Sequence, residues 1–162
     1  MDLREHTFQW KDIGPSLEAA KTLSGLEYMT AIMEGRLPAA PIAAPFGMAL
    51  TKVSEGHVVF EATPAEYHYN PLGTVHGGMA ATLLDSSLAC CIHTMLPAGV
   101  GYTTLEIKVN YIRAMTAKTG PVRCIGTVIH VGRTTATSEA KLLDSTGKLY
   151  AHGSTTCLIF RP

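Results

Sequence analysis

The segment Gly78–Met95 reads GMAATLLDSSLACCIHTM and decides the fold of this chain. It predicts a helix that is apolar on nearly every side, and the following Leu96-Pro97-Ala98-Gly99 ends it. A helix of this kind has no broad face suited to water, so other elements have to cover it. The helix contains one carboxylate, Asp85. Because a buried charge without partners is costly, its presence indicates a functional role.

Stretches with the two-residue alternation of β-strands supply such a cover. Two precede the helix, joined by the turn Ser54-Glu55-Gly56, and four follow it. The predicted strands are Phe46–Val53, His57–Thr63, Thr104–Ile112, Val122–Val131, Thr134–Leu143 and Lys148–Phe160. Their short connections favour antiparallel pairing. The predicted fold class is therefore α+β, with a curved antiparallel sheet of about six strands wrapped around one long apolar helix.

The chain is predicted to divide into two parts. Residues 1–40 form a helical extension and linker, and residues 41–162 form the main domain. In the extension, Ser16 is placed to cap a helix over 17–33, where apolar residues recur at three- and four-residue spacing. The sequence assigns no role to residues 1–24.

Composition excludes several classes of function. The 162 residues contain 13 basic and 13 acidic side chains, which leaves no net charge to attract nucleic acid or a membrane surface. No apolar run reaches the ~20 residues that span a bilayer, and the N-terminus lacks the apolar core of a secretory signal. We therefore expect a cytoplasmic protein. The four cysteines lack C-x-x-C spacing and the histidines lack ligand spacing, so no metal site is predicted.

The chemistry-bearing stretch is Asn70–Gly78, which reads NPLGTVHGG and leads into the helix. A helix N-terminus offers unpaired N–H groups and a partial positive charge, so it can hold an oxygen that becomes negative. Gly77 and Gly78 have no Cβ, which lets a carbonyl group approach the backbone. With Asp85 as the acid or base, this pattern predicts an acyl-transfer site.

The spacing of these residues predicts that the site is shared between subunits. Gly77 and Asp85 are eight residues apart, which is about 12 Å along a helix. Reacting groups have to come within roughly 3–3.5 Å. One helix cannot bring both residues to the same carbonyl, whereas a two-fold dimer can pair Gly77 of one subunit with Asp85 of the other.

From about Gly25 to Leu158 the chain resembles the hotdog-fold thioesterases. The resemblance is to the phenylacetate-pathway (PaaI-like) branch, which is related to the 4-hydroxybenzoyl-CoA thioesterases. It is carried by Tyr69–Gly78, Leu83-Leu84-Asp85, Leu96–Gly99, Thr103–Tyr111 and the pattern Asp144-x-x-Gly147-Lys148-Leu149. Asn70 six residues before His76, and Asp85 nine residues after it, make the combination specific.

This resemblance implies hydrolysis of acyl-CoA thioesters by homodimers that often pair into tetramers, without a cofactor. By position, Gly77 donates its N–H to the thioester carbonyl, and Asp85 of the facing subunit activates water or acts as a nucleophile. Asn70 helps to hold the water, and His76 orients the thioester end of the site. Thr104 supplies a hydroxyl near the acid, and strand alternation places it on the polar face of its strand.

The resemblance also implies a set of substrate-binding residues. Gly78 and Leu72 lie beside the helix start, at the thioester end of the substrate. The turn Gly132-Arg133-Thr134 falls near the phosphates of coenzyme A, and the Arg133 guanidinium suits a phosphate group.

Two other functions stay open at this point. One is a non-catalytic module that binds acyl-CoA, and the other is an enoyl-CoA hydratase on the same fold. The complete set of Asn70, His76, Gly77 and Asp85 favours the hydrolase. The sequence does not distinguish aryl, arylacetyl and medium-chain acyl groups. The acyl pocket is expected at the dimer interface, around Tyr67–Leu72 and the helix.

Overall fold

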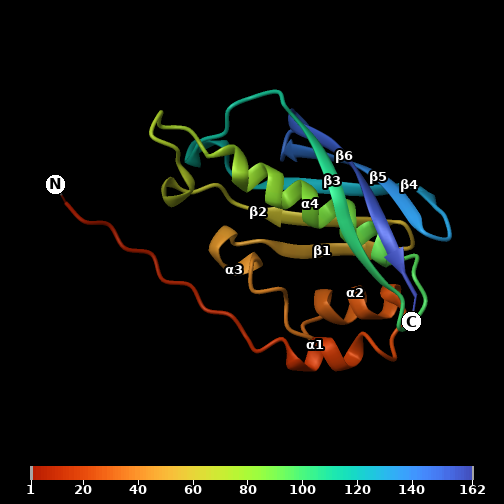
Figure 1. Cartoon of the computed structure of the whole chain (residues 1–162). Coiled ribbons are helices and arrows are strands. Elements are labelled where there is room, and N and C mark those ends of the chain that lie inside the picture. The colour runs from red at the N-terminus through yellow and green to blue at the C-terminus, as the bar shows by residue number, and fades with distance from the viewer. Residues whose placement is uncertain (1, 162) are drawn as a thin grey trace.

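A six-stranded antiparallel sheet wraps around the long helix α4 in the computed structural model, which describes residues 2–161 (Figure 1). The strands follow the order β1-β2-β4-β5-β6-β3, so β1 and β3 are the edges. Their bounds are β1 (Ala49–Ser54), β2 (His57–Ala62), β3 (Gly101–Tyr111), β4 (Val122–Val131), β5 (Thr135–Asp144) and β6 (Leu149–Phe160). The predicted α+β class and the hotdog architecture are confirmed.

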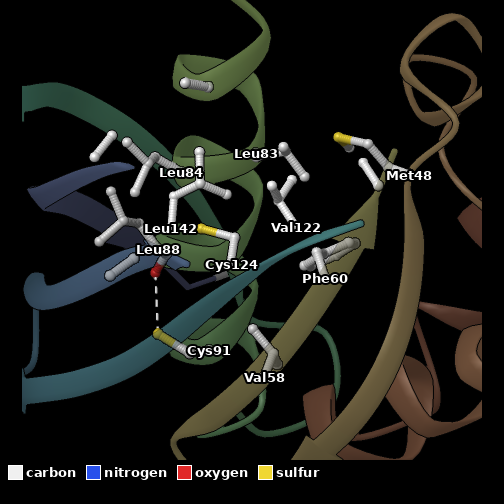
Figure 2. Close-up of a cluster of buried hydrophobic side chains, with 14 of the residues drawn as sticks. Met48, Val58, Phe60, Leu83, Leu84, Leu88, Cys91, Val122, Cys124 and Leu142 are labelled. Carbon is white, nitrogen blue, oxygen red and sulfur yellow. Dashed lines mark hydrogen bonds between the residues drawn. The ribbon is translucent and has the colours of Figure 1, made fainter. Parts of the chain in front are cut away.

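Helix α4 (Gly77–His93) supplies the centre of the core, close to its predicted bounds. Leu83, Leu84 and Leu88 are completely buried and lie among strand residues such as Val122 and Leu142 (Figure 2). Each such side chain stabilises the fold by about 1.5–3 kcal/mol relative to an exposed one. The apolar character that predicted a covered helix thus corresponds to the part of the chain that the sheet encloses.

The helix and the sheet approach each other unusually closely at β4 and β5. A Cβ atom added to Gly126 would lie 2.1 Å from the carbonyl oxygen of Ser87, so only glycine fits there. The hydroxyl of Ser138 donates a hydrogen bond to the Leu88 carbonyl oxygen at 2.7 Å. These contacts fix the position of the middle of α4 on the sheet.

The single N-terminal helix predicted over 17–33 is wrong. The structure contains two helices instead, α1 (Gly14–Ala19) and α2 (Gly25–Met33). Ser24 caps α2 in a reciprocal pair, because its hydroxyl accepts from the Glu27 N–H and the Glu27 carboxylate accepts from the Ser24 N–H. This capping box starts a new helix where the spacing of apolar residues suggested continuity.

Tertiary contacts then hold the two short helices in place. The Gly25 N–H donates to the Leu96 carbonyl oxygen at 2.9 Å, and a Cβ on Gly25 would lie 1.7 Å from the His93 carbonyl oxygen. The predicted cap Ser16 lies inside α1, where its hydroxyl donates to the Pro38 carbonyl oxygen at 3.2 Å. Helix α2 therefore begins directly against the end of α4.

The first strand also starts later than predicted. A one-turn helix, α3 (Ala43–Phe46), precedes it and ends at Gly47, whose φ of 57° is left-handed. Two 3₁₀ turns, Glu66–His68 and Ala117–Thr119, complete the secondary structure.

A bulge in β3 corrects the predicted placement of Thr104. The register against β6 shifts between Thr104 and Glu106, and Leu105 is left exposed. Thr104 before the bulge and Ile107 and Val109 after it therefore all face the helix. Simple alternation had put Thr104 and Ile107 on opposite faces, because it takes no account of an extra residue.

The four cysteines are free thiols. Burial raises the pKa of Cys91 and of Cys124 to about 12, so neither is a thiolate near neutral pH. Residues 2–161 include no helix that is both long and apolar enough to cross a membrane. The same residues contain no cluster of histidine, cysteine and acidic side chains able to hold a metal ion.

Candidate active site

The N-terminus of α4 presents one free backbone donor. His76 is the N-cap residue, and its Nδ1 accepts a hydrogen bond from the Gly78 N–H at 2.8 Å. The neighbouring Gly77 N–H has no acceptor within residues 2–161. Because the partial positive charge of the helix lies at this end, the Gly77 N–H is suited to a carbonyl oxygen that gains negative charge.

Tyr111 is a part of this site that sequence reasoning missed. Its hydroxyl donates to the Gly77 carbonyl oxygen at 3.2 Å, and its ring would lie 3.1 Å from a Cβ at position 77. The two residues line a cavity of about 260 Å³ together with Arg113. A tyrosine in an alternating strand gives no sequence signal of this contact, because only the fold brings the end of β3 to the start of α4.

Asp85 and Thr104 form the second part of the candidate site. The Thr104 hydroxyl donates to Oδ1 of the half-buried Asp85 at 3.1 Å. The Thr82 hydroxyl, one turn earlier in α4, donates to the Gly78 carbonyl oxygen instead. Asp85 makes no ion pair with any described residue. The carboxylate is thus oriented by one hydroxyl, which leaves Oδ2 available for another group.

Asn70 and Leu72 lie in the loop that leads to His76. Asn70 Oδ1 accepts from the Leu72 N–H at 2.9 Å, and Asn70 Nδ2 donates to the Thr74 hydroxyl at 3.0 Å. Gly73, with φ of 78°, completes the turn, and the Leu72 side chain at its tip is 88% exposed. Asn70 therefore shapes the approach to the helix start.

The predicted phosphate-binding turn lies at the end of the sheet opposite to the start of α4. Gly101 pairs with Phe160 at the same end of the sheet as Thr134, whose carbonyl oxygen accepts from the Ile159 N–H. Gly77 lies at the opposite end, where β3 finishes at Tyr111. The eleven residues of β3 span about 33 Å. Gly132, Arg133 and Thr134 are thus far from Gly77 and Gly78 of their own chain.

Comparison with known proteins shows the family of this chain. A family described as the thioesterase superfamily matches residues 72–151. Human acyl-coenzyme A thioesterase 13 is 33% identical over 111 residues, which cover 66% of this chain and 76% of that protein. The chain belongs to the thioesterase superfamily. It is an acyl-CoA thioesterase-type hydrolase, like the relatives with which it aligns.

Two further relatives of this thioesterase come from bacteria. The 1,4-dihydroxy-2-naphthoyl-CoA hydrolase of Listeria monocytogenes is 27% identical over 103 residues, or 64% of this chain and 82% of that one. The crystal structure of a phenylacetic acid degradation-related protein from Ralstonia eutropha superposes with a TM-score of 0.73 at 26% identity. It covers 81% of this chain and 98% of its own. Residues 72–151, which the thioesterase superfamily matches, include both parts of the candidate site.

Proposed function

We propose that this thioesterase hydrolyses an acyl- or aryl-CoA thioester by direct attack of water. Asp85 takes a proton from the water while the water oxygen bonds to the thioester carbonyl carbon. The carbonyl oxygen becomes negative and accepts a hydrogen bond from the Gly77 N–H. The C–S bond then breaks and coenzyme A leaves as a thiolate, which takes the proton from Asp85. The free acid is released and the Asp85 carboxylate is regenerated. The reaction needs no cofactor.

The observation that carries this proposal is the unpaired Gly77 N–H. His76 accepts the adjacent Gly78 N–H, which leaves the Gly77 N–H at the helix start without an acceptor among the described residues. Loss of one such donor typically costs about 2.7–4 kcal/mol of transition-state stabilisation in enzymes of this chemistry. His76 is then a positioning residue, since its bond to Gly78 fixes the first turn of the helix.

The edge strand β3 supports a homodimer with shared sites. It offers eleven residues whose outer edge has no partner strand among the described residues. Such an edge invites pairing with a second chain. Antiparallel pairing of two β3 strands about a two-fold axis would reverse one chain relative to the other. The Gly77 end of one subunit would then meet the middle and far end of its partner, and two such dimers would form the tetramer.

In this arrangement the remaining predicted residues acquire roles. Asn70 uses one of its two amide N–H groups on Thr74, and the second is free to hold the attacking water. Leu72 and Gly78 would contact the thioester end of the substrate. The turn Gly132-Arg133-Thr134, in which Arg133 and Thr134 are exposed, would come from the partner and meet the coenzyme A phosphates. All of these residues lie within residues 41–162, which we propose as the catalytic domain. Residues 1–40 are the extension.

Thiol release from a panel of acyl-CoA substrates tests the proposal. Phenylacetyl-, hydroxybenzoyl-, short-chain and medium-chain thioesters should include at least one that the protein turns over. Asp85→Asn should keep the fold and lose at least ~10² in turnover, because the amide cannot take the proton. Asp12→Asn changes the same group at an exposed site and should retain full activity.

Two results would contradict the proposed hydrolysis of acyl-CoA thioesters. Binding of acyl-CoA without thiol release from any member of the panel would indicate the binding module. Water addition to crotonyl-CoA without thiol release would indicate the hydratase. Full activity in Asp85→Asn would remove Asp85 from the mechanism while leaving the activity established.

A further inference from the structure

The largest cavity beside the candidate site lies beneath the N-terminal helices. It has a volume of about 740 Å³, within the usual range for small-molecule pockets. Helices α1 and α2 and residues 38–43 form one side, and β1, α4 and the start of β3 form the other. We call it the extension cavity. Figure 1 shows α1 and α2 next to β1, near the end of the sheet at which β3 begins.

One end of the extension cavity adjoins the catalytic carboxylate. Thr104 and Ser86 both line it. Thr104 donates to Asp85 Oδ1 at 3.1 Å, and Ser86 follows Asp85 in α4. A thioester carbonyl held at Asp85 would therefore have its acyl group at the mouth of this cavity.

The wall of the extension cavity is apolar and uncharged. Its lining includes flexible aliphatic and methionine side chains, among them Leu17, Ile32, Met33, Met48 and Leu50. No lysine, arginine, aspartate or glutamate is among its described lining residues. Such a surface rejects phosphates and carboxylates and gains free energy from each buried methylene group.

The basic side chain among the described lining residues, His93, is neutral near neutral pH. His93 lies between the rings of Tyr28 and Tyr102, with centroids 5.1 Å and 5.0 Å away. Burial lowers the pKa of His93 to about 4. Histidine therefore adds no positive charge to the cavity near neutral pH, and the wall stays suited to hydrocarbon.

The N-terminal wall is held in place rather than loosely apposed. The Ser24–Glu27 capping box and the bond from the Gly25 N–H to Leu96 fix the start of α2. The Ser16 hydroxyl bonded to Pro38 joins α1 to the segment that closes the cavity.

A second cavity, of about 450 Å³, lies near the loop where the acyl pocket was expected. Tyr67, Tyr69, His76 and Gly78 line it, with His6 and His68. Apolar and aromatic side chains such as Phe8, Phe46 and Met79 line it as well. Because it is smaller than the extension cavity, it offers less room for an extended acyl chain.

From these observations we infer that residues 14–43 build the acyl-chain site of this enzyme, and that its substrates carry aliphatic acyl groups of medium length. The inference rests on the proposed function. Methionine and isoleucine side chains can adapt to an alkyl chain, and the cavity volume far exceeds what a short acyl group fills. The extension would then select the substrate, whereas α4 and β3 would perform the hydrolysis.

Filling the extension cavity from the α2 side tests the inference. Ile32→Trp should lower kcat/KM for decanoyl-CoA by about tenfold or more, because the larger ring occupies space needed by the distal methylenes. The same variant should retain its kcat/KM for butanoyl-CoA, whose chain ends near Thr104. Ile129→Trp, the same change at an exposed position of β4, should leave both values unchanged. Met33→Trp repeats the test should Ile32→Trp fail to fold.

Binding of S-decyl-coenzyme A, a thioether that cannot be hydrolysed, separates this inference from the proposed function. Ile32→Trp should weaken its binding by about tenfold and leave the affinity for free coenzyme A unchanged. That result in a protein without thioesterase activity would keep the acyl site and reject the hydrolase. Unchanged binding and unchanged kcat/KM for decanoyl-CoA, or an equal loss with both substrates, would overturn the inference.

Discussion

At the scale of single residues, the orientation of the Asp85 carboxylate depends on the hydroxyl of Thr104. It is the one described side chain that hydrogen-bonds the Asp85 carboxylate. Hydrogen bonds to charged groups contribute about 1.5–3 kcal/mol. Thr104→Val keeps the shape but removes the donor, so kcat should fall by about tenfold or more with KM little changed.

Thr104→Ser restores the hydroxyl and should recover most of the lost kcat. Steady-state kinetics on the three proteins provides the measurement. A merely structural role would predict that Val, which preserves the packing, outperforms Ser. That order of activities would contradict a role for Thr104 in orienting the carboxylate.

Sequence reasoning at this scale identified Asp85, Gly77 and Thr104 but not how they are held. Asp85 stood out because it is the one carboxylate of an apolar helix. Thr104 was matched through the resemblance and then placed on the wrong face of its strand. The bulge at Leu105 depends on pairing between β3 and β6, which no local periodicity encodes. Tyr111 was missed because only the fold brings the end of β3 to the start of α4.

At the scale of elements, the start of α2 is the sensitive point of the extension. Ser24 accepts the Glu27 N–H and forms the capping box. Ser24→Ala should lower the free energy of unfolding by about 0.5–2 kcal/mol, because the first turn loses a partner for its N–H groups. Ser24→Asp keeps a capping oxygen and should recover most of the loss.

Urea denaturation of the three proteins measures this effect, with Ser54→Ala at an exposed strand end as the control. Equal stability of wild type and Ser24→Ala would show that docking against α4 alone holds α2. The S-x-x-E pattern was present in the sequence, but the apolar spacing across it favoured one continuous helix.

At the scale of the whole molecule, the decisive question is whether the sites are shared between subunits. Asp85→Asn and Gly77→Pro should each be inactive as pure proteins. Proline suits the first position of a helix and removes the N–H of residue 77, although the Tyr111 ring, 3.1 Å from a Cβ at this position, has to shift slightly to admit it. Co-expression of the two variants should restore about a quarter of wild-type activity, because half of the dimers are mixed and each mixed dimer has one intact site.

Pairing Asp85→Asn with Asp85→Ala serves as the control and should restore nothing. Tagging the two subunits differently confirms that mixed dimers form. Mixed dimers without recovered activity would show that each subunit carries a site of its own. Gly77 and Asp85 of the same chain would then have to approach one carbonyl group, although ~12 Å along α4 separates them.

The sequence by itself determined the architecture of this protein and the identity of its candidate site residues. An unbroken apolar helix and six alternating segments leave few ways to bury their surfaces, so local patterns were enough to predict the sheet around α4. The division of the N-terminal helix, the bulge in β3 and the cavity beneath α1 and α2 were decided only by the tertiary structure. Each depends on contacts between segments far apart in the chain, such as Gly25 with His93, and local periodicity carries no information about them.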